Sequence, residues 1–265
     1  MSTTTSPPTA SATRTRLGAR EAARGTLRIA GRELGSGIDS MVAPVYAIAF
    51  ALLANSVFMN EFFLRGVVDM GPFFESLPLL FAAFLPAISM RLWAEERKAR
   101  TAELLLTLPI HPLQAILGKH LAALGMLALL LATSLPIPLM LLVLGEPDLG
   151  RILSGYLGAF LLGSAFLALG SLASACTKDQ IVAFVSTAVF SFALVLSGDP
   201  RLVAILDGLS PALSLGTWLQ QSFAVTPRYE LLTSGLVALS SLVQFLGLTA
   251  LGLIGTALVL RRNRT

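Results

Sequence analysis

The chain has 265 residues, of which 55% are hydrophobic and only 13% are charged. Soluble domains carry about 25% charged residues, so this composition excludes an ordinary soluble protein and indicates a membrane protein. The formal net charge is +4, but the positive residues stand in short blocks beside apolar runs, which argues against a nucleic-acid-binding face. The single cysteine, Cys176, excludes an internal disulfide and a multi-cysteine zinc site.

The N-terminal 40 residues divide into two parts. Residues 1–16 are mainly Ser, Thr, Pro and Ala, too polar to bury a core, so we expect a disordered tail. Residues 17–40 place apolar residues at helical spacing and arginines every four residues along another face, namely Arg20, Arg24, Arg28 and Arg32. This pattern predicts a cytoplasmic amphipathic helix in the membrane interface, with its arginines at anionic head groups; a solvated basic arm is the alternative.

The rest of the chain is a series of long apolar runs. A helix that crosses a bilayer needs about 20 mostly apolar residues. Six stretches approach or exceed this length: residues 41–59, 74–94, 116–144, 151–175, 180–197 and 231–260. Prolines inside the second and third stretches predict kinks there, namely Pro78, Pro86, Pro136 and Pro138. We therefore predict an all-α integral membrane protein whose residues 41–260 form a domain of six transmembrane helices.

The positive residues orient these spans. Fifteen of the 19 Lys and Arg residues stand before the first span, between the second and third, between the fourth and fifth, or after the sixth. The other four stand on the opposite side. Positive residues near spans favour the cytoplasm, so both termini are predicted to be cytoplasmic, including a basic C-terminus at residues 261–265.

Two regions outside this pattern carry structural information. The fourth span places small residues at four-residue spacing, Gly155, Ala159 and Gly163, which predicts close helix packing either within the chain or against a second copy. Residues 198–230 are too apolar for an ordinary loop but form no run long enough to span. They predict re-entrant segments or a cap of short helices between the fifth and sixth spans.

A charged, proline-broken segment separates the second and third spans. Thr101 suits a helix N-cap, and Glu103 lies in the first turn, where the helix dipole favours a negative charge. The leucines of one face are Leu104, Leu105 and Leu108, and the prolines that end the helix are Pro109 and Pro112. We predict a short cytoplasmic helix at residues 101–108, whose leucines either dock a soluble partner or pack into lipid or under the bundle.

The residues around this segment also resemble a known family. The likeness lies in residues 86–98, 101–109 and 117–119, with further similarity at residues 32–46 and from 209 to the arginines at 261–262. These stretches resemble the permease subunits of type-2 ABC (ABC-2) exporters. The resemblance is closest to the branch that contains the gliding-motility permease and the permease of nitrous-oxide-reductase maturation.

The resemblance implies a six-span permease of the bacterial cytoplasmic (inner) membrane that pairs with a second copy or a paralogue. Two cytosolic ABC ATPase subunits would hold ATP and Mg²⁺, and an auxiliary subunit with an extracytoplasmic domain is a further expected partner. By position, the coupling helix that contacts the ATPase falls on Glu96 and on Thr101 through Pro109. The family usually has Gly just before this Thr, whereas this chain has Arg100.

The sequence argues against several other functions. It contains no phosphate-binding loop pattern and no nucleophile–base cluster, so we expect no enzyme activity and no cofactor in this chain. His111 and His120 are nine residues apart, which is not the spacing of a helical metal pair. Ionisable residues avoid the centres of the predicted spans, which argues against ion-coupled transport. The main alternative is a membrane anchor or assembly subunit that recruits a soluble ATPase without moving cargo, and an integral-membrane enzyme is a third hypothesis.

Overall fold

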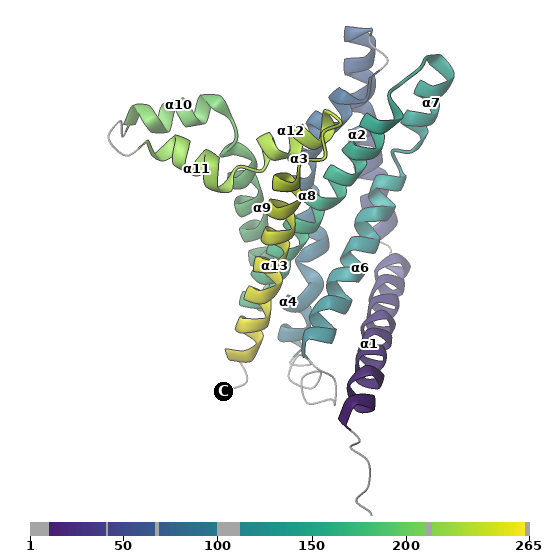
Figure 1. Cartoon of the computed structure of the whole chain (residues 1–265), viewed down its shortest axis with the longest axis vertical. Helices are drawn as coiled ribbons and strands as arrows, with labels where there is room; N and C mark the ends of the chain where they lie inside the picture. The colour runs from purple at the N-terminus through teal and green to yellow at the C-terminus, as the bar shows by residue number, and fades with distance from the viewer. Residues whose placement is uncertain (1–10, 41, 67–68, 100–111, 210–213, 263–265) are drawn as a thin grey trace, which may run out of the picture.

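The computed structural model describes residues 11–40, 42–66, 69–99, 112–209 and 214–262, and these residues form helices with short connections (Figure 1). No strand occurs in these ranges. The helices are α1 (Ser11–Asp39), α2 (Val42–Arg65), α3 (Gly71–Ser89), α4 (Arg91–Lys98), α6 (Pro112–Ala132), α7 (Pro136–Leu144), α8 (Leu149–Cys176), α9 (Gln180–Leu196), α10 (Pro200–Leu209), α11 (Leu215–Phe223), α12 (Thr226–Thr233) and α13 (Leu239–Arg262).

Five helical stretches are long and apolar enough to cross a membrane, and they begin and end at Pro44–Leu64, Gly71–Lys98, Pro112–Leu144, Leu149–Cys176 and Leu239–Arg262. Helix α9 passes the same test only together with α10, from which it is bent by 86°. The described part of the chain is therefore an all-helical, multi-pass membrane protein with five such stretches, or six if the bent pair counts as one. The prediction of an all-α membrane protein is confirmed.

The prolines act differently in the two helices where kinks were expected. The third predicted span is broken: α6 ends at Ala132 and α7 begins at Pro136, whose missing N–H suits the first turn of a helix. In the gap, the hydroxyls of Thr133 and Ser134 donate to carbonyls three residues upstream, at 2.6 and 2.7 Å. In contrast, α3 continues as one helix through both Pro78 and Pro86.

The sixth membrane helix begins later than predicted. Residues 231–233 belong to α12, and Gly235 then adopts a left-handed conformation with φ +92°. The N–H of Gly235 donates to the carbonyl of Leu232, and the N–H of Leu236 donates to that of Leu231. This is a Schellman motif, which ends a helix because glycine tolerates the positive φ. Helix α13 therefore starts only at Leu239.

The N-terminal helix is longer than predicted, and the described part of the apolar segment between the fifth and sixth predicted spans is mainly helical. Helix α1 begins at Ser11, upstream of the predicted start at residue 17, and continues through Gly35 and Gly37 to Asp39. Residues 198–230 were predicted to form re-entrant segments or a cap of short helices; they contain short helices, and the bend of 86° between α9 and α10 is compatible with a broken span or a re-entrant loop. Helices α10 and α11 pack on each other and project sideways from the bundle (Figure 1). Asp207 of α10 joins them, because its carboxylate accepts from the N–H of Gly216 at 2.7 Å and the hydroxyl of Thr217 at 2.6 Å.

Helix α8 forms the centre of the bundle and packs against α3, α6, α9, α12 and α13. Aromatic rings fill much of the core around it, including the fully buried Phe50, Phe58, Phe73, Phe81, Phe166 and Phe245. The outward faces of α2, α9 and α13 are apolar and exposed, for example at Leu52, Ile181 and Ile254. Large apolar surfaces of this kind mark contact with a membrane or another protein, which agrees with the membrane assignment.

Candidate functional site

The predicted coupling segment follows α4 and precedes α6 in the chain, and α4 ends and α6 begins at the end of the bundle where α1 begins and α13 ends (Figure 1). Its candidate residues fall in the range 100–111, outside the described residues, and include Thr101, Glu103, Leu104, Leu105, Leu108 and Pro109. The coupling helix therefore stays a prediction. Glu96, the remaining candidate, is described, and it belongs to a buried polar cluster that joins α4 to α6.

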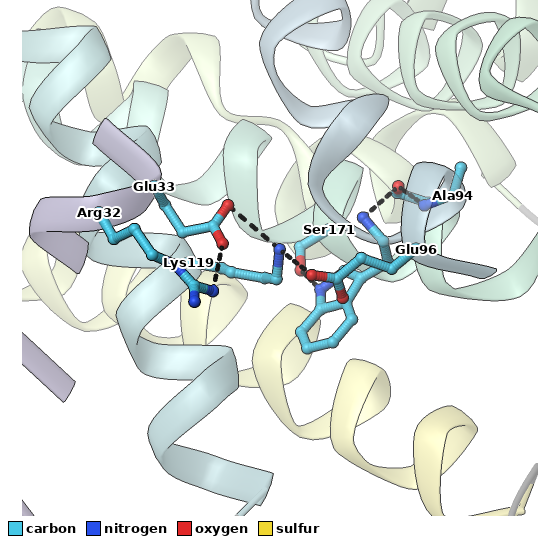
Figure 2. A network of polar contacts seen from close by, with 8 residues as sticks. Arg32, Glu33, Ala94, Glu96, Lys119 and Ser171 are labelled. Carbon is cyan, nitrogen blue, oxygen red and sulfur yellow. Dashed lines mark hydrogen bonds and ion pairs between the residues drawn. The ribbon is translucent and has the colours of Figure 1, made fainter. Parts of the chain in front are cut away.

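The centre of this cluster is Lys119 of α6, whose side chain is only 4% exposed. Its ammonium lies 2.9 Å from a carboxylate oxygen of Glu96 on α4 and 3.3 Å from one of Glu33 on α1 (Figure 2). It also lies 5.3 Å from the centre of the Trp93 ring. A buried ammonium is costly unless it is paired, and two carboxylates with an aromatic face supply that pairing. One lysine thereby connects three helices.

The outer edge of the cluster carries a second positive group. Arg32 of α1 lies 3.4 Å from the other carboxylate oxygen of Glu33, and its own side chain is 70% exposed. Glu33 therefore stands between a buried ammonium and an exposed guanidinium (Figure 2). The exposed pair contributes little on its own because water screens it. Its position, however, makes Glu33 the link between the buried cluster and the surface of α1.

Ser174 of α8 holds the joint between α3 and α4. Its hydroxyl donates to the carbonyl of Met90 at 2.8 Å and accepts from the N–H groups of Trp93 and Ala94, each at 3.0 Å. In a continuous helix the N–H of Ala94 would donate directly to the carbonyl of Met90, four residues back. A side chain inserted into this ladder bends or interrupts a helix. The hydroxyl thus explains why α3 ends at Ser89 and α4 starts at Arg91.

Two further contacts fasten α4 to α8. The fully buried Trp93 donates from its indole N–H to the hydroxyl of Ser171 at 3.1 Å. At the other end of α4, the guanidinium of Arg97 donates to the carbonyl of Ala175. A cation at the last turn of a helix is favourable because the free carbonyls there carry partial negative charge. Helix α4 is therefore attached to α8 at both its ends.

A ladder of hydroxyl groups extends the cluster into the bundle. Ser171 and Ser164 of α8 each face a threonine of α13, Thr256 and Thr249, at 3.4 Å. His120 of α6 lies 3.2 Å from the Ser164 hydroxyl and is itself 5% exposed. The paired hydroxyls are seven residues apart on both helices, so they repeat along one interface. The ladder connects α6, α8 and α13.

The sequence interpretation did not foresee this cluster. Lys119 was counted among the positive residues that orient the spans, and His120 was considered only as a candidate metal ligand, whereas both side chains are buried. One signal was present: Ser164, Ser171 and Ser174 recur on α8 at spacings of seven and three, which places polar groups on one face of an otherwise apolar helix. A polar face on a membrane helix indicates polar partners on its neighbours.

The predicted interfacial helix α1 runs alongside α6 (Figure 1). Glycines of α6 allow this approach: Gly118 faces the side chain of Ile29 and Gly125 faces that of Leu34. Arg24, Arg28 and Arg32 are exposed, and Arg20 lies on the same helix. Part of the apolar stripe of α1 thus packs on protein, while Leu27 is 64% exposed. The position of α1 in the membrane interface stays a prediction.

The small residues of α8 serve packing inside the chain. A side chain added at Gly155 would overlap the ring of Phe74 on α3, and one added at Gly163 would overlap Leu127 on α6. Ala159, between them, is fully buried. Of the two interpretations of this stripe, contact with neighbouring helices of the same chain is the one that these distances support.

Within the described ranges, no group of three or more His, Cys, Asp or Glu residues could hold a metal ion. Comparison with known proteins adds no assignment: no protein-family model matches the chain, and no curated protein matches it.

Proposed function

We propose that this chain is the transmembrane permease subunit of an ATP-driven ABC-2 type exporter in a bacterial cytoplasmic membrane. Several membrane-spanning helices and a predicted leucine-rich coupling segment at residues 101–108 support the proposal. ATP hydrolysis would take place on two separate ABC ATPase subunits. A second permease copy or paralogue would complete the translocation path.

The observation that carries the proposal is the connection of both flanks of residues 100–111 to the bundle. Glu96 on one flank pairs with Lys119 on the other at 2.9 Å. The first flank is also fixed to α8 through Trp93 and Arg97. A displacement of the segment between them would therefore move α4 and α6 together and reach α8, rather than be absorbed by a loose loop.

The energetics of the cluster suit this role. Removing one partner of a buried ion pair costs about 3–5 kcal/mol, so the Lys119 connection resists small distortions. The joint between α3 and α4 at Met90 is different, because the hydroxyl of Ser174 there interrupts the backbone hydrogen bonds of the helix. A stiff unit of α4 and α6 that follows the interruption between α3 and α4 would suit a hinge or rigid-body transition. The energy for the motion would come from contacts that the ATPase makes differently in its two nucleotide states.

The ATPase contact can be tested by changing the predicted leucine face. In the experiment, the tagged chain is purified from its own membranes, and co-purified proteins that carry a phosphate-binding loop are identified by mass spectrometry. The test variant combines Leu104→Asp, Leu105→Asp and Leu108→Asp. The control combines Val143→Asp and Leu144→Asp, two exposed residues of α7 at the far end of the bundle (Figure 1). We expect the test variant to lose the ATPase and the control to retain it; retention by both would remove the coupling assignment.

A second readout separates transport from anchoring. The wild-type complex is trapped with ATP and vanadate, and amide hydrogen exchange is compared with that of the nucleotide-free complex. An exporter subunit changes exchange in α4, α6 and α8 because the permease itself alternates between states. An anchor or assembly subunit binds the ATPase but shows the same exchange in both nucleotide states.

A further inference from the structure

A cavity of about 220 Å³ opens between α1, the α3–α4 joint and α6, and Glu33, a partner of the buried Lys119, is one of its lining residues. Its inner wall is apolar and comes mainly from Ile88, Leu92, Ala122, Ala123, Met126 and Leu130. The helices that supply this wall belong to stretches able to cross a membrane, Gly71–Lys98 and Pro112–Leu144. The volume is below the range of about 300–1,000 Å³ typical of sites that enclose a drug-sized ligand, so an occupant here extends beyond the opening.

The opening of the cavity carries charges of both signs. Arg91 and Glu95, both exposed, line it from α4 and are four residues apart, which places them on one face of that helix. Tyr46 also lines the cavity, and its hydroxyl is buried and has no hydrogen-bond partner among the described residues. A buried hydroxyl without a partner is costly, so the cavity offers a donor to an incoming acceptor.

We propose that this cavity binds one zwitterionic phospholipid, with part of an acyl chain against the apolar wall and the head group at the opening. Arg91 would bind the phosphate and Glu95 the ammonium group, and the Tyr46 hydroxyl would donate to an ester oxygen of the lipid. An anionic lipid gains less here, because Glu95 has no positive group of the lipid to bind. The lipid fills the space between α1 and the α3–α4 joint. This inference is independent of the proposed transport function.

The test uses a phosphatidylethanolamine with a photoactivatable diazirine in its acyl chain. The full chain is placed in nanodiscs of equal parts phosphatidylethanolamine and phosphatidylglycerol, irradiated and mapped by peptide mass spectrometry. We expect concentrated labelling in the peptides that contain Ile88, Leu92 and Met126. Excess unlabelled phosphatidylethanolamine removes this labelling, and the same excess of phosphatidylglycerol removes less. This competition requires no mutation, so it holds even if a variant fails to fold.

Two matched pairs of variants assign the labelling to the cavity. Ala87→Phe fills the space from α3, whereas Ala83→Phe adds the same ring to an exposed position of α3 that does not line it. We expect at least a fivefold loss of labelling for the first and no change for the second. Arg91→Gln lowers the labelling about threefold, the scale of one exposed charge pair. Lys98→Gln, the same charge change elsewhere on α4, leaves it unchanged.

Three outcomes would overturn the proposal. The first is labelling spread evenly over the lipid-facing sides of α2, α9 and α13, which indicates bulk membrane lipid. The second is equal competition by both unlabelled lipids, which removes the head-group assignment. The third is the same labelling in Ala87→Phe and Ala83→Phe, which places the bound lipid elsewhere.

Discussion

The ammonium of Lys119 lies 2.9 Å from the carboxylate of Glu96, and this pair joins the two helices on either side of residues 100–111. Outside this pair, α4 packs mainly on α8 and α6 packs mainly on α1, but Trp93 of α4 also shares a buried apolar cluster with Ala115 and Ile116 of α6. The ion pair and this apolar contact therefore set the spacing of the two flanks together. Glu33 supplies a second carboxylate at 3.3 Å and brings α1 into the same unit.

Replacing Lys119 by Met tests this unit. The change removes the buried ammonium that lies between the carboxylates of Glu33 and Glu96. We expect a loss of about 3 kcal/mol in the free energy of unfolding, at the low end of the range for buried pairs because both carboxylates keep some exposure and Arg32 stays beside Glu33. The measurement is thermal unfolding in a fixed detergent. The triple variant Lys119→Met, Glu33→Gln, Glu96→Gln removes the uncompensated charges, and we expect it to recover more than half of the loss. An unchanged unfolding temperature in Lys119→Met would show that the ion pairs of Lys119 do not stabilise the fold.

Ser174→Ala tests the joint between α3 and α4. The variant loses the hydroxyl that stands between Met90 and Ala94, and with it three hydrogen bonds. We expect a cost of about 1–3 kcal/mol and faster amide exchange at residues 91–98, because the first N–H groups of α4 lose their acceptor. Ser186→Ala is the control, since that hydroxyl donates only to carbonyls of its own helix. Slower exchange in α4 of Ser174→Ala would mean that the two helices merge into one and that the hydroxyl is not needed as a spacer.

Gly155→Ala distinguishes packing within the chain from packing between copies. The added methyl group would push against the ring of Phe74, so we expect a stability loss of about 1–3 kcal/mol with no change in oligomeric state. Gly247→Ala is the matched control, because nothing lies within 4 Å of the added group and alanine favours a helix. Thermal unfolding and light scattering in detergent measure both quantities. A change of oligomeric state at unaltered unfolding temperature would assign the stripe to contact between copies.

Asp207→Ala tests the projecting pair α10–α11. The carboxylate accepts three hydrogen bonds from Gly216 and Thr217 at the start of α11, so its loss should loosen that helix. We expect faster hydrogen exchange confined to α11 and an unchanged unfolding temperature of the bundle, because the pair lies to the side of it (Figure 1). Asp207→Asn keeps one acceptor oxygen and should show a smaller effect. Faster exchange that extends into α9 and α12 would show that the pair is part of the main core.

Much of the helical architecture was predictable from the sequence, because span length and apolar composition follow directly from bilayer thickness. Pro136 marked the break between α6 and α7 correctly. The late start of α13 was missed because Leu231 and Leu232 continue the apolar pattern across the turn at Gly235, and only the positive φ of that glycine separates the two helices.

The polar cluster could not be predicted in the same way. In sequence, Lys119 lies 23 residues from Glu96 and 86 residues from Glu33. The contacts between these side chains therefore depend on how α1, α4 and α6 pack. The role of Ser174 was equally hidden, since a serine on an apolar helix can donate to its own backbone. Its contact with Met90 appears only when α4 and α8 are placed side by side.

We propose that force on residues 100–111 passes into the bundle through the Lys119–Glu96 pair. The most direct measurement is hydrogen exchange of the ATPase complex, with and without ATP and vanadate, in the wild type and in the charge-balanced variant Glu96→Gln, Lys119→Met. We expect both proteins to retain the ATPase. In the wild type, the nucleotide-dependent change should extend from residues 100–111 into α4, α6 and the end of α8, whereas in the variant α4, which stays attached to α8 through Trp93 and Arg97, should no longer change together with α6. The same spread in both proteins, or no nucleotide-dependent change in the wild type, would show that the Lys119–Glu96 pair does not transmit the motion.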